Sequence, residues 1–176
     1  MKQRGAICNM KRIREKNVDE YIIDSLFNLM KKKKYESISI TEIVEKAGAS
    51  RISFYRNFTS KEDIIVKWID KVTDKFLSES DISFKNNTNK DYFMKLFTHL
   101  NNYKDRCILI YKAGLDYLLK NKFDEVFITI YIKEFDPYKV YFTSGGIYNT
   151  YYYWLSNGCK ETPEELSNKL VDLLLK

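Results

Sequence analysis

The sequence predicts an all-α protein with an N-terminal three-helix domain, a C-terminal helical bundle and about nine helices. Three observations support this fold class. Apolar residues recur at three-to-four-residue spacing through most of the chain. No run alternates apolar and polar residues well enough to favour a strand over a helix. Proline or glycine also stands near several expected helix ends, at Pro137, Gly158 and Pro163.

The 176-residue chain is 44% hydrophobic, which is enough for a buried core. Its net charge of +6 is unevenly distributed. Residues 1–62 hold 14 Lys and Arg against 8 Asp and Glu, whereas residues 63–176 hold 16 of each. A basic part attached to a neutral part is expected of a nucleic-acid-binding protein with a second task. Basic residues scattered only for solubility would not predict this division.

The first expected helix runs from about Arg12 to Lys33. Its apolar residues form one stripe, which we expect to cover the helices that follow. The run from Lys31 to Lys34 suits the negative end of that helix. Residues 1–10 show no periodic pattern, so they form either an arm that touches phosphates or a solubilising tail.

The stretch from Ser39 to Ile65 predicts two short helices joined by a tight turn, followed at once by a third helix. Ser39 can cap the first helix while Glu42 reaches back to the cap amide, which is a capping box. Gly48 stands where the chain leaves this helix, and glycine adopts the positive φ needed there at little cost. Ser50 then caps the second helix. The short connection predicts a helix-turn-helix.

The second helix is expected at about Arg51 to Asn57. We expect Ile52, Phe54 and Phe58 to pack inward at helical spacing. The remaining side chains are polar and suited to base edges and phosphates, and we expect them to face outward. They are Arg51, Ser53, Tyr55, Arg56 and Asn57.

A third helix is expected to begin after the cap residue Ser60. Its first turn holds Lys61, where the helix dipole favours an acid, and a phosphate brought to Lys61 would explain this cation. Apolar residues continue at helical spacing to Glu79. One long helix would then link a helix-turn-helix domain, residues 1–60, to a helical regulatory and dimerisation domain, residues 61–176. The Ser- and Asn-rich segment that follows predicts a loop.

These motifs resemble the DNA-binding signature of the TetR/AcrR family of transcriptional regulators. The similarity lies in IVEKAGAS, FYRNF and SKEDI, and it extends from Val18 to about Phe76. Ile52 departs from the pattern, because the family often has glycine or another small residue there. The resemblance implies two groups of DNA contacts. Arg51, Ser53, Tyr55, Arg56 and Asn57 would face DNA, and Ser39, Thr41 and Lys61 would serve backbone positioning or nearby contacts.

Beyond the loop, every periodic segment again predicts a helix. IYIKEF and VYFTSGGIY contain β-favouring residues, yet neither alternates as a strand would. The stretch from Val140 to Cys159 carries no charge and raises the alternative of a membrane span. Its hydroxyl, amide and glycine residues favour instead a helix buried at a subunit interface. The expected helices are residues 91–102, 105–113, 115–135, 138–156 and 163–175.

The segment SGGIYNTYYYWLSNGCKETPEEL is similar to the C-terminal domain of one TetR subgroup. Thr162 is expected to cap the last helix, with Pro163 in its first turn. In the family the last two helices of each subunit pack as a four-helix bundle, so the resemblance implies a homodimer. The expected interface consists of Gly145, Tyr148, Tyr152, Leu166, Leu170, Leu173 and Leu174.

Tyrosine is concentrated in the second half of the chain, where 11 of the 14 lie between Tyr92 and Tyr153. A pocket lined by aromatic faces with polar tips would suit a flat or cationic small molecule. The alternative is a tyrosine-rich core and dimer interface, since aromatic residues at helical spacing usually pack. The candidate pocket residues are Tyr103, Tyr111, Tyr117, Phe127, Tyr148 and Tyr152.

No motif in the sequence predicts catalysis, a metal site or a cofactor. His99 is the sole histidine, and the sequence has no Gly-rich phosphate loop or nucleophile elbow. Cys8, Cys107 and Cys159 are far apart and are expected to be free thiols in a reducing compartment. Because catalytic motifs are absent, we expect that the protein is not an enzyme. The charged N-terminal segment lacks a signal-peptide pattern, so we expect the protein to be cytoplasmic.

We therefore expect a homodimeric DNA-binding transcriptional regulator, and specifically a repressor relieved by a small-molecule effector. Two recognition helices roughly 34 to 36 Å apart would enter successive major grooves of double-stranded DNA, so the operator should be a near-palindrome. The alternative is a helical dimeric protein-interaction module or co-activator without its own effector pocket.

Overall fold

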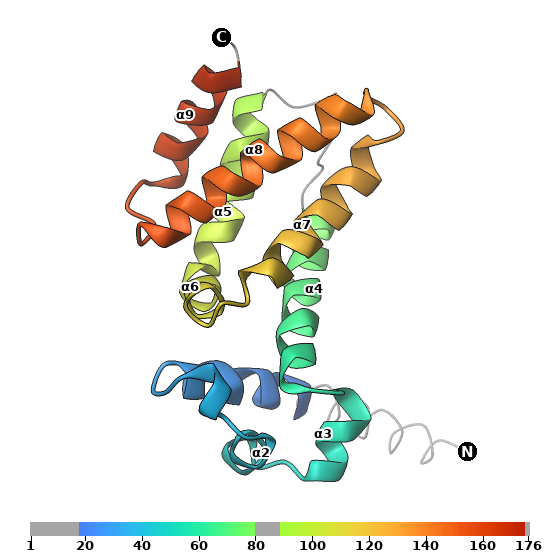
Figure 1. Ribbon diagram of the computed structural model, residues 1–176, viewed down its shortest axis with the longest axis vertical. Helices are drawn as coiled ribbons and strands as arrows, with labels where there is room; N and C mark the ends of the chain where they lie inside the picture. The colour runs from blue at the N-terminus through green and yellow to red at the C-terminus, as the bar shows by residue number, and fades with distance from the viewer. Residues whose placement is uncertain (1–17, 80–88, 175–176) are drawn as a thin grey trace, which may run out of the picture. The chain divides into compact units, whose positions relative to one another are not determined.

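The computed structural model describes residues 18–79 and 89–174, and all regular structure within these ranges is helical (Figure 1). The expected all-α fold class is confirmed. The segments IYIKEF and VYFTSGGIY, with their β-favouring residues, lie in helices or in a turn between helices. The chain divides into two compact units, Met1–Trp68 and Ile69–Lys176, and the division falls inside one long helix.

The first unit is a set of short helices around one apolar core. Residues 18–30 form its first helix, and the core contains Ile22, Leu26 and Phe27 from it. The ring of Phe27 packs against that of Trp68 with centroids 4.9 Å apart, so the first helix covers the helices that follow, as predicted. Next come η1 (Tyr35–Ser37), α2 (Ile40–Ala47), α3 (Arg51–Asn57) and the first part of α4 (Lys61–Glu79).

Local hydrogen bonds set the ends of α2 and α3. The Ser39 hydroxyl accepts from the Glu42 amide at 3.2 Å, and the Glu42 carboxylate accepts from the Ser39 amide at 2.9 Å, which completes the predicted capping box. Gly48 ends α2 with φ of 62°, a conformation that glycine adopts without strain. The Ser50 hydroxyl then accepts from the Ser53 amide at 3.0 Å and starts α3.

The second unit continues from α4 into α5 (Asn89–Asn102), α6 (Lys104–Lys112), α7 (Asp116–Tyr131), α8 (Pro137–Ser156) and α9 (Pro163–Leu174). Within this unit α9 packs along α5, and both α6 and α7 pack against α8, as Figure 1 shows. Its core is strongly aromatic. Trp154, Phe93 and Phe97 are almost completely buried, and the Phe97 and Trp154 rings lie 6.3 Å apart.

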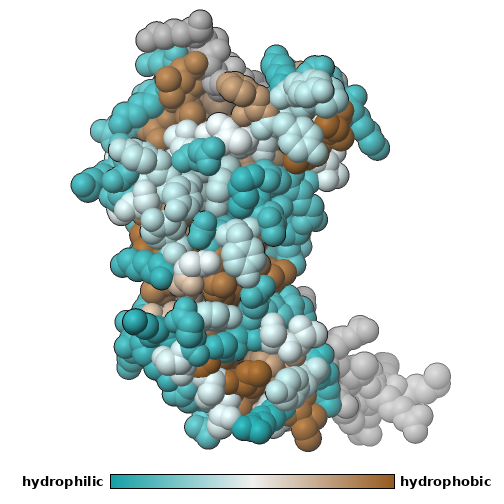
Figure 2. All heavy atoms as spheres, viewed as in Figure 1, coloured by the Kyte–Doolittle hydropathy of each residue, from teal (hydrophilic) through white to brown (hydrophobic). Residues whose placement is uncertain are grey.

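Helix α8 has a buried half and an exposed half. Trp154, Tyr151 and Ile147 belong to the buried half. The exposed half holds Tyr138, Tyr141, Phe142, Asn149 and Tyr153. Figure 2 shows the surface over α8 in white and pale teal, the colours of residues that are neither strongly hydrophilic nor hydrophobic. Within the described residues no helix has both the length and the apolar composition that crossing a bilayer would require.

Candidate nucleic-acid interface

Helix α3 buries one side and presents the other to solvent. Phe54 and Phe58 anchor it, with exposed fractions of 0% and 2%, and their ring centroids lie 5.7 Å apart. Arg51, Tyr55 and Arg56 are exposed. The outward polar face of this helix therefore carries two arginines and a tyrosine, which can donate hydrogen bonds to base edges or phosphates.

Ile52 does not pack inward, and that prediction was wrong. Its side chain is 75% exposed. The reason is the turn of the helix. Each residue advances about 100°, so Ile52 lies about 200° from Phe54 and points away from the core that Phe54 and Phe58 share. Helical angles computed from the sequence would have identified this residue as part of the outer face.

Several predicted DNA-contacting residues also bond within the helix-turn-helix. An Arg51 guanidinium nitrogen donates to the Thr41 hydroxyl and so joins α3 to α2. The Ser53 hydroxyl is hydrogen-bonded to that of Ser50 at 3.0 Å. The Asn57 side-chain amide donates to the Ser53 carbonyl at 3.0 Å and is half-buried. These contacts restrain the side chains at the surface of α3 before any ligand binds.

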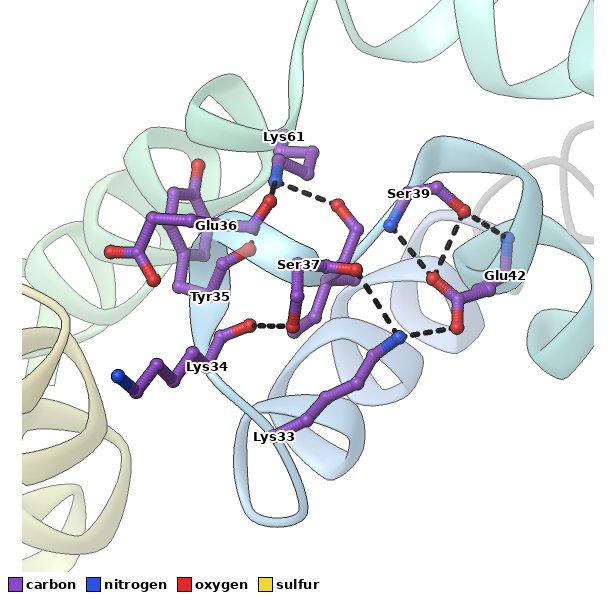
Figure 3. A network of polar contacts seen from close by, with 9 residues as sticks. Lys33, Lys34, Tyr35, Glu36, Ser37, Ser39, Glu42 and Lys61 are labelled. Carbon is purple, nitrogen blue, oxygen red and sulfur yellow. Dashed lines mark hydrogen bonds and ion pairs between the residues drawn. The ribbon is translucent and has the colours of Figure 1, made fainter.

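The Lys61 ammonium is held by the protein's own backbone. It donates to the carbonyl oxygens of Tyr35 at 2.9 Å and Ile38 at 2.7 Å, and lies 3.5 Å from that of Glu36 (Figure 3). It also lies over the Tyr35 ring, 4.5 Å from the centroid. The cation in the first turn of α4 is thus explained by η1 and the residue after it, without a phosphate. A direct phosphate contact from Lys61 stays a prediction.

A second lysine, Lys33, contacts both η1 and α2. The Lys33 ammonium forms an ion pair with Glu42 and donates to the Ser37 carbonyl at 3.3 Å (Figure 3). The hydrogen bond from Lys33 and those from the Ser39 amide and hydroxyl lower the pKa of Glu42 to about 2. The side chain of Ser39 is engaged in this cap, so the residue holds the start of α2.

A third lysine supports the end of α3. The Lys67 ammonium donates to the Asn57 carbonyl and lies over the Phe58 ring, 5.1 Å from its centroid. Lys33 was predicted only as part of the basic run at the end of the first helix, and Lys67 was given no role, because the groups that they contact are brought to them by the fold.

The residues predicted to line a pocket all lie in the second unit, and two of them, Tyr148 and Phe127, pack against the same ring, that of Phe123. The rings of Tyr111 and Tyr152 pack edge to face with centroids 5.2 Å apart. Tyr148 donates its hydroxyl to the Asp116 carbonyl at 3.0 Å. Tyr103 lies beside His99, whereas Phe127 stacks on Phe123. Tyr117 is 44% exposed. A ligand among these residues stays a prediction.

The residues predicted for the dimer interface differ in how much surface they expose. Tyr148, Leu166 and Leu170 are each 5% exposed, so the core of the single chain already accounts for them. Leu173 is 71% exposed and Tyr152 is 37% exposed. Gly145 is partly exposed, and the Leu174 side chain lies outside the described part of the chain.

The exposed half of α8 also holds large side chains that the predicted interface does not include. Tyr138 and Phe142 are 87% and 80% exposed, and Tyr141 and Tyr153 are 60% and 67% exposed. The signal that could have found them is the uncharged run itself, divided by helical angle into an inner and an outer half. In the described parts of the chain, no group of His, Cys, Asp and Glu side chains is arranged to hold a metal ion.

The geometry of the first unit defines a class of protein. A helix-turn-helix whose second helix exposes cationic and hydroxyl side chains is the arrangement with which transcription regulators enter the major groove of DNA. Residues 22–67 match the family described as bacterial regulatory proteins, tetR family, and residues 87–176 match a transcriptional regulator C-terminal region. The chain belongs to the TetR family of transcription regulators. It is accordingly a DNA-binding protein and not an enzyme.

Solved structures of the same fold include a TetR transcriptional regulator from Streptococcus agalactiae 2603V. It has 14% sequence identity and a TM-score of 0.68, covering 94% of this chain and 98% of that one. The fatty acid degradation regulator FadR from Bacillus halodurans has 16% identity and a TM-score of 0.58, with coverage of 89% and 97%. The dihydroxyacetone kinase operon activator DhaS has 19% identity and a TM-score of 0.56, with coverage of 90% and 94%. A sequence search of curated proteins found no match.

Proposed function

We propose that this regulator is a homodimeric repressor that binds a near-palindromic operator through α3 and is released by a small molecule. The observation that carries the proposal is the composition of α3, which exposes Arg51, Tyr55 and Arg56 opposite the buried rings of Phe54 and Phe58. A cationic face on a helix with no acidic residue attracts a polyanion and can donate hydrogen bonds to bases.

Each predicted contact residue takes a part in this proposal. Arg56 and Arg51 contact base edges or nearby phosphates, and Tyr55, Ser53 and Asn57 add hydrogen bonds to bases or to the backbone. Ser39 and Thr41 act from α2, where Ser39 caps the helix and Thr41 accepts from Arg51. Lys61 acts by positioning, because its ammonium holds the turn before α2.

Dimerisation is proposed through the exposed half of α8 together with Leu173. This half has no charged residue after Lys139, and it holds the large exposed rings of Tyr138 and Phe142. Gly145 and Gly146 lie in the middle of the helix, where a Cβ added to either would meet no atom within 4 Å. Glycine costs a helix about 1 kcal/mol relative to alanine. Close approach of a second copy would explain two glycines that the single chain does not require.

The effector is proposed to bind among the aromatic residues of the second unit. Tyr111, Tyr152 and Tyr148 offer ring faces and hydroxyls from α6 and α8, which suit a flat or cationic molecule. Such a ligand would release DNA only to the extent that it binds the free form more tightly than the DNA-bound form. A thermal-shift screen of small aromatic and cationic compounds tests this part, because a ligand specific for the folded state raises its apparent stability.

The DNA-binding part is tested by selecting duplexes from a random pool with the purified protein. The expected result is a near-palindromic site, bound with a steep decrease in affinity as salt increases. An absence of enriched sequence, with no retardation of any duplex, would contradict the proposal. The oligomeric state at micromolar concentration, measured by sedimentation, tests the dimer separately.

The second candidate is an activator or co-activator without an effector pocket. DhaS, one of the structural neighbours, is named an operon activator, so the fold itself is compatible with activation. In vitro transcription from a promoter that carries the selected site distinguishes the two. A repressor decreases the transcript as protein is added, and an activator increases it.

A further inference from the structure

Ile52 lies near the middle of the outer face of α3. At about 100° per residue, the direction opposite the buried pair Phe54 and Phe58 falls on Arg56, and Ile52, one turn earlier, lies about 40° from it. Tyr55 and Arg51 lie further round on one side of this direction, and Ser53 on the other. Ile52 is 75% exposed, more than Tyr55 at 61%. The most outward-facing pair on the helix therefore combines an aliphatic side chain with a guanidinium.

Neither folding nor helix formation explains isoleucine at this position. Its hydrocarbon is left in water and adds nothing to the core. Isoleucine is β-branched and is a weaker helix former than Ala, Lys or Glu. A single exposed apolar residue is ordinary elsewhere on a protein surface. At the centre of the face that we propose enters the groove, however, this side chain would be buried when DNA binds.

We propose that Ile52 is a specificity-determining residue that packs on the C5-methyl group of a thymine in the operator. Thymine is the only base that presents a methyl group in the major groove. A cytosine at the same place would turn its amino donor toward a hydrocarbon that cannot accept it, which costs affinity. The inference rests on the proposed entry of α3 into the major groove and adds a residue that makes no hydrogen bond.

The geometry also predicts where the thymine lies. Residues one turn apart are about 6 Å apart along a helix, and base pairs rise about 3.4 Å along DNA. The base that Ile52 touches should therefore fall within about two base pairs of the base or phosphate that Arg56 contacts. In a palindromic site this arrangement occurs once in each half.

The test removes the methyl group from the DNA and the side chain from the protein in the same experiment. Each thymine of the selected site is replaced in turn by deoxyuridine, which keeps every hydrogen-bonding group. The dissociation constants of the wild type and of Ile52→Ala are measured for each duplex. One position per half-site should weaken wild-type binding about fourfold when the methyl is lost, the value of one buried methyl group. The Ile52→Ala variant should bind the thymine and deoxyuridine duplexes equally well.

Two further variants make the result specific to this contact. Ile130→Ala truncates another exposed isoleucine, in α7, and should retain the wild-type sensitivity to the methyl group. Ile52→Val keeps a branched side chain and should retain part of it. Circular dichroism and binding to a random duplex establish that each variant folds and binds DNA.

Two results would overturn the inference. One is a deoxyuridine effect of the same size in the wild type and in Ile52→Ala. The other is an operator at which no thymine responds and Ile52→Ala binds as tightly as the wild type. Either leaves the proposed function intact, because the operator is still bound. Failure of the proposed function would appear earlier, as the absence of any selected DNA.

Discussion

Helices α3 and α8 are built alike but expose different chemistry. Each buries aromatic rings on one side, Phe54 in α3 and Trp154 in α8. On the other side, α3 exposes Arg51 and Arg56, whereas the exposed half of α8 is uncharged beyond Lys139. The buried halves explain folding. The difference between the exposed halves fits the two partners proposed above, a polyanion for α3 and a neutral protein surface for α8.

The largest expected effect is that of Arg56→Ala on operator binding. Loss of one bidentate contact to a base costs about 1–3 kcal/mol, and a dimer loses two, so affinity should fall about a hundredfold or more. Binding to random duplex should fall much less. Titration of both duplexes, with Lys160→Ala as a charge-matched control in the second unit, measures this difference. An equal loss for both duplexes would mean that Arg56 contacts only phosphate.

Phe142→Ala tests the α8 side of the comparison. The ring is 80% exposed in the single chain. Truncation of an aromatic interface residue costs about 1 kcal/mol or more in each copy, and a dimer loses two, so dimerisation should weaken roughly thirtyfold or more. Sedimentation equilibrium over a range of concentrations measures the change. Ile130→Ala is the control. A wild-type dimerisation constant for Phe142→Ala would remove α8 from the proposed interface.

The Lys61→Met substitution tests whether the Lys61 ammonium contacts a DNA phosphate or only stabilises the fold. Loss of its backbone hydrogen bonds should decrease the free energy of unfolding by about 1–2 kcal/mol. Operator affinity should also fall, while its slope against the logarithm of salt concentration stays unchanged. Urea unfolding and a salt titration provide the two readouts. A slope lowered by about two, one phosphate per subunit, would instead restore the predicted direct contact.

Gly145→Ala separates the stability of α8 from its association. With open space around an added Cβ, the monomer should gain about 1 kcal/mol from better helix propensity. The dimer should become weaker if a second copy approaches the helix closely. Thermal unfolding at low concentration and sedimentation at high concentration measure the two effects. A variant in which both quantities increase would show that no partner needs the glycine.

The bounds of most helices could be predicted from the sequence, because the ends of a helix depend on neighbouring residues. The bounds of α3, Arg51–Asn57, were predicted without error, since Ser50 caps one end and the connection to α4 is too short to extend the other. The C-terminal helices were also predicted to within a few residues, except that α7 ends at Tyr131 and not at residue 135.

What the sequence could not supply was the partner of each exposed or apolar group. The stripe that contains Leu166 and Leu170 predicts that α9 is covered, but not whether its own chain or a second copy covers it. The structure buries both residues in a unit where α9 packs along α5. Lys61 is similar. Its charge was evident, but the carbonyls that it binds lie 23 to 26 residues earlier and are brought to it only by the fold.

The smallest expected effect concerns Glu42, whose carboxylate, like the Lys61 ammonium, is bonded to groups of the protein itself. Its pKa is lowered from 4.5 to about 2 by Lys33 and Ser39, so the ionised form is favoured in the folded state. The stability that it contributes should be complete above pH 4.5 and should be lost as the pH falls to about 2.

Glu42→Gln keeps the side-chain cap but removes the charge, so it should be less stable than the wild type at pH 7 and equal to it near pH 2. Urea unfolding across this range measures the difference, with Glu45→Gln in the same helix as the control. A difference that persists at pH 2 would mean that the shape of the Glu42 side chain, and not its ionisation, stabilises the start of α2.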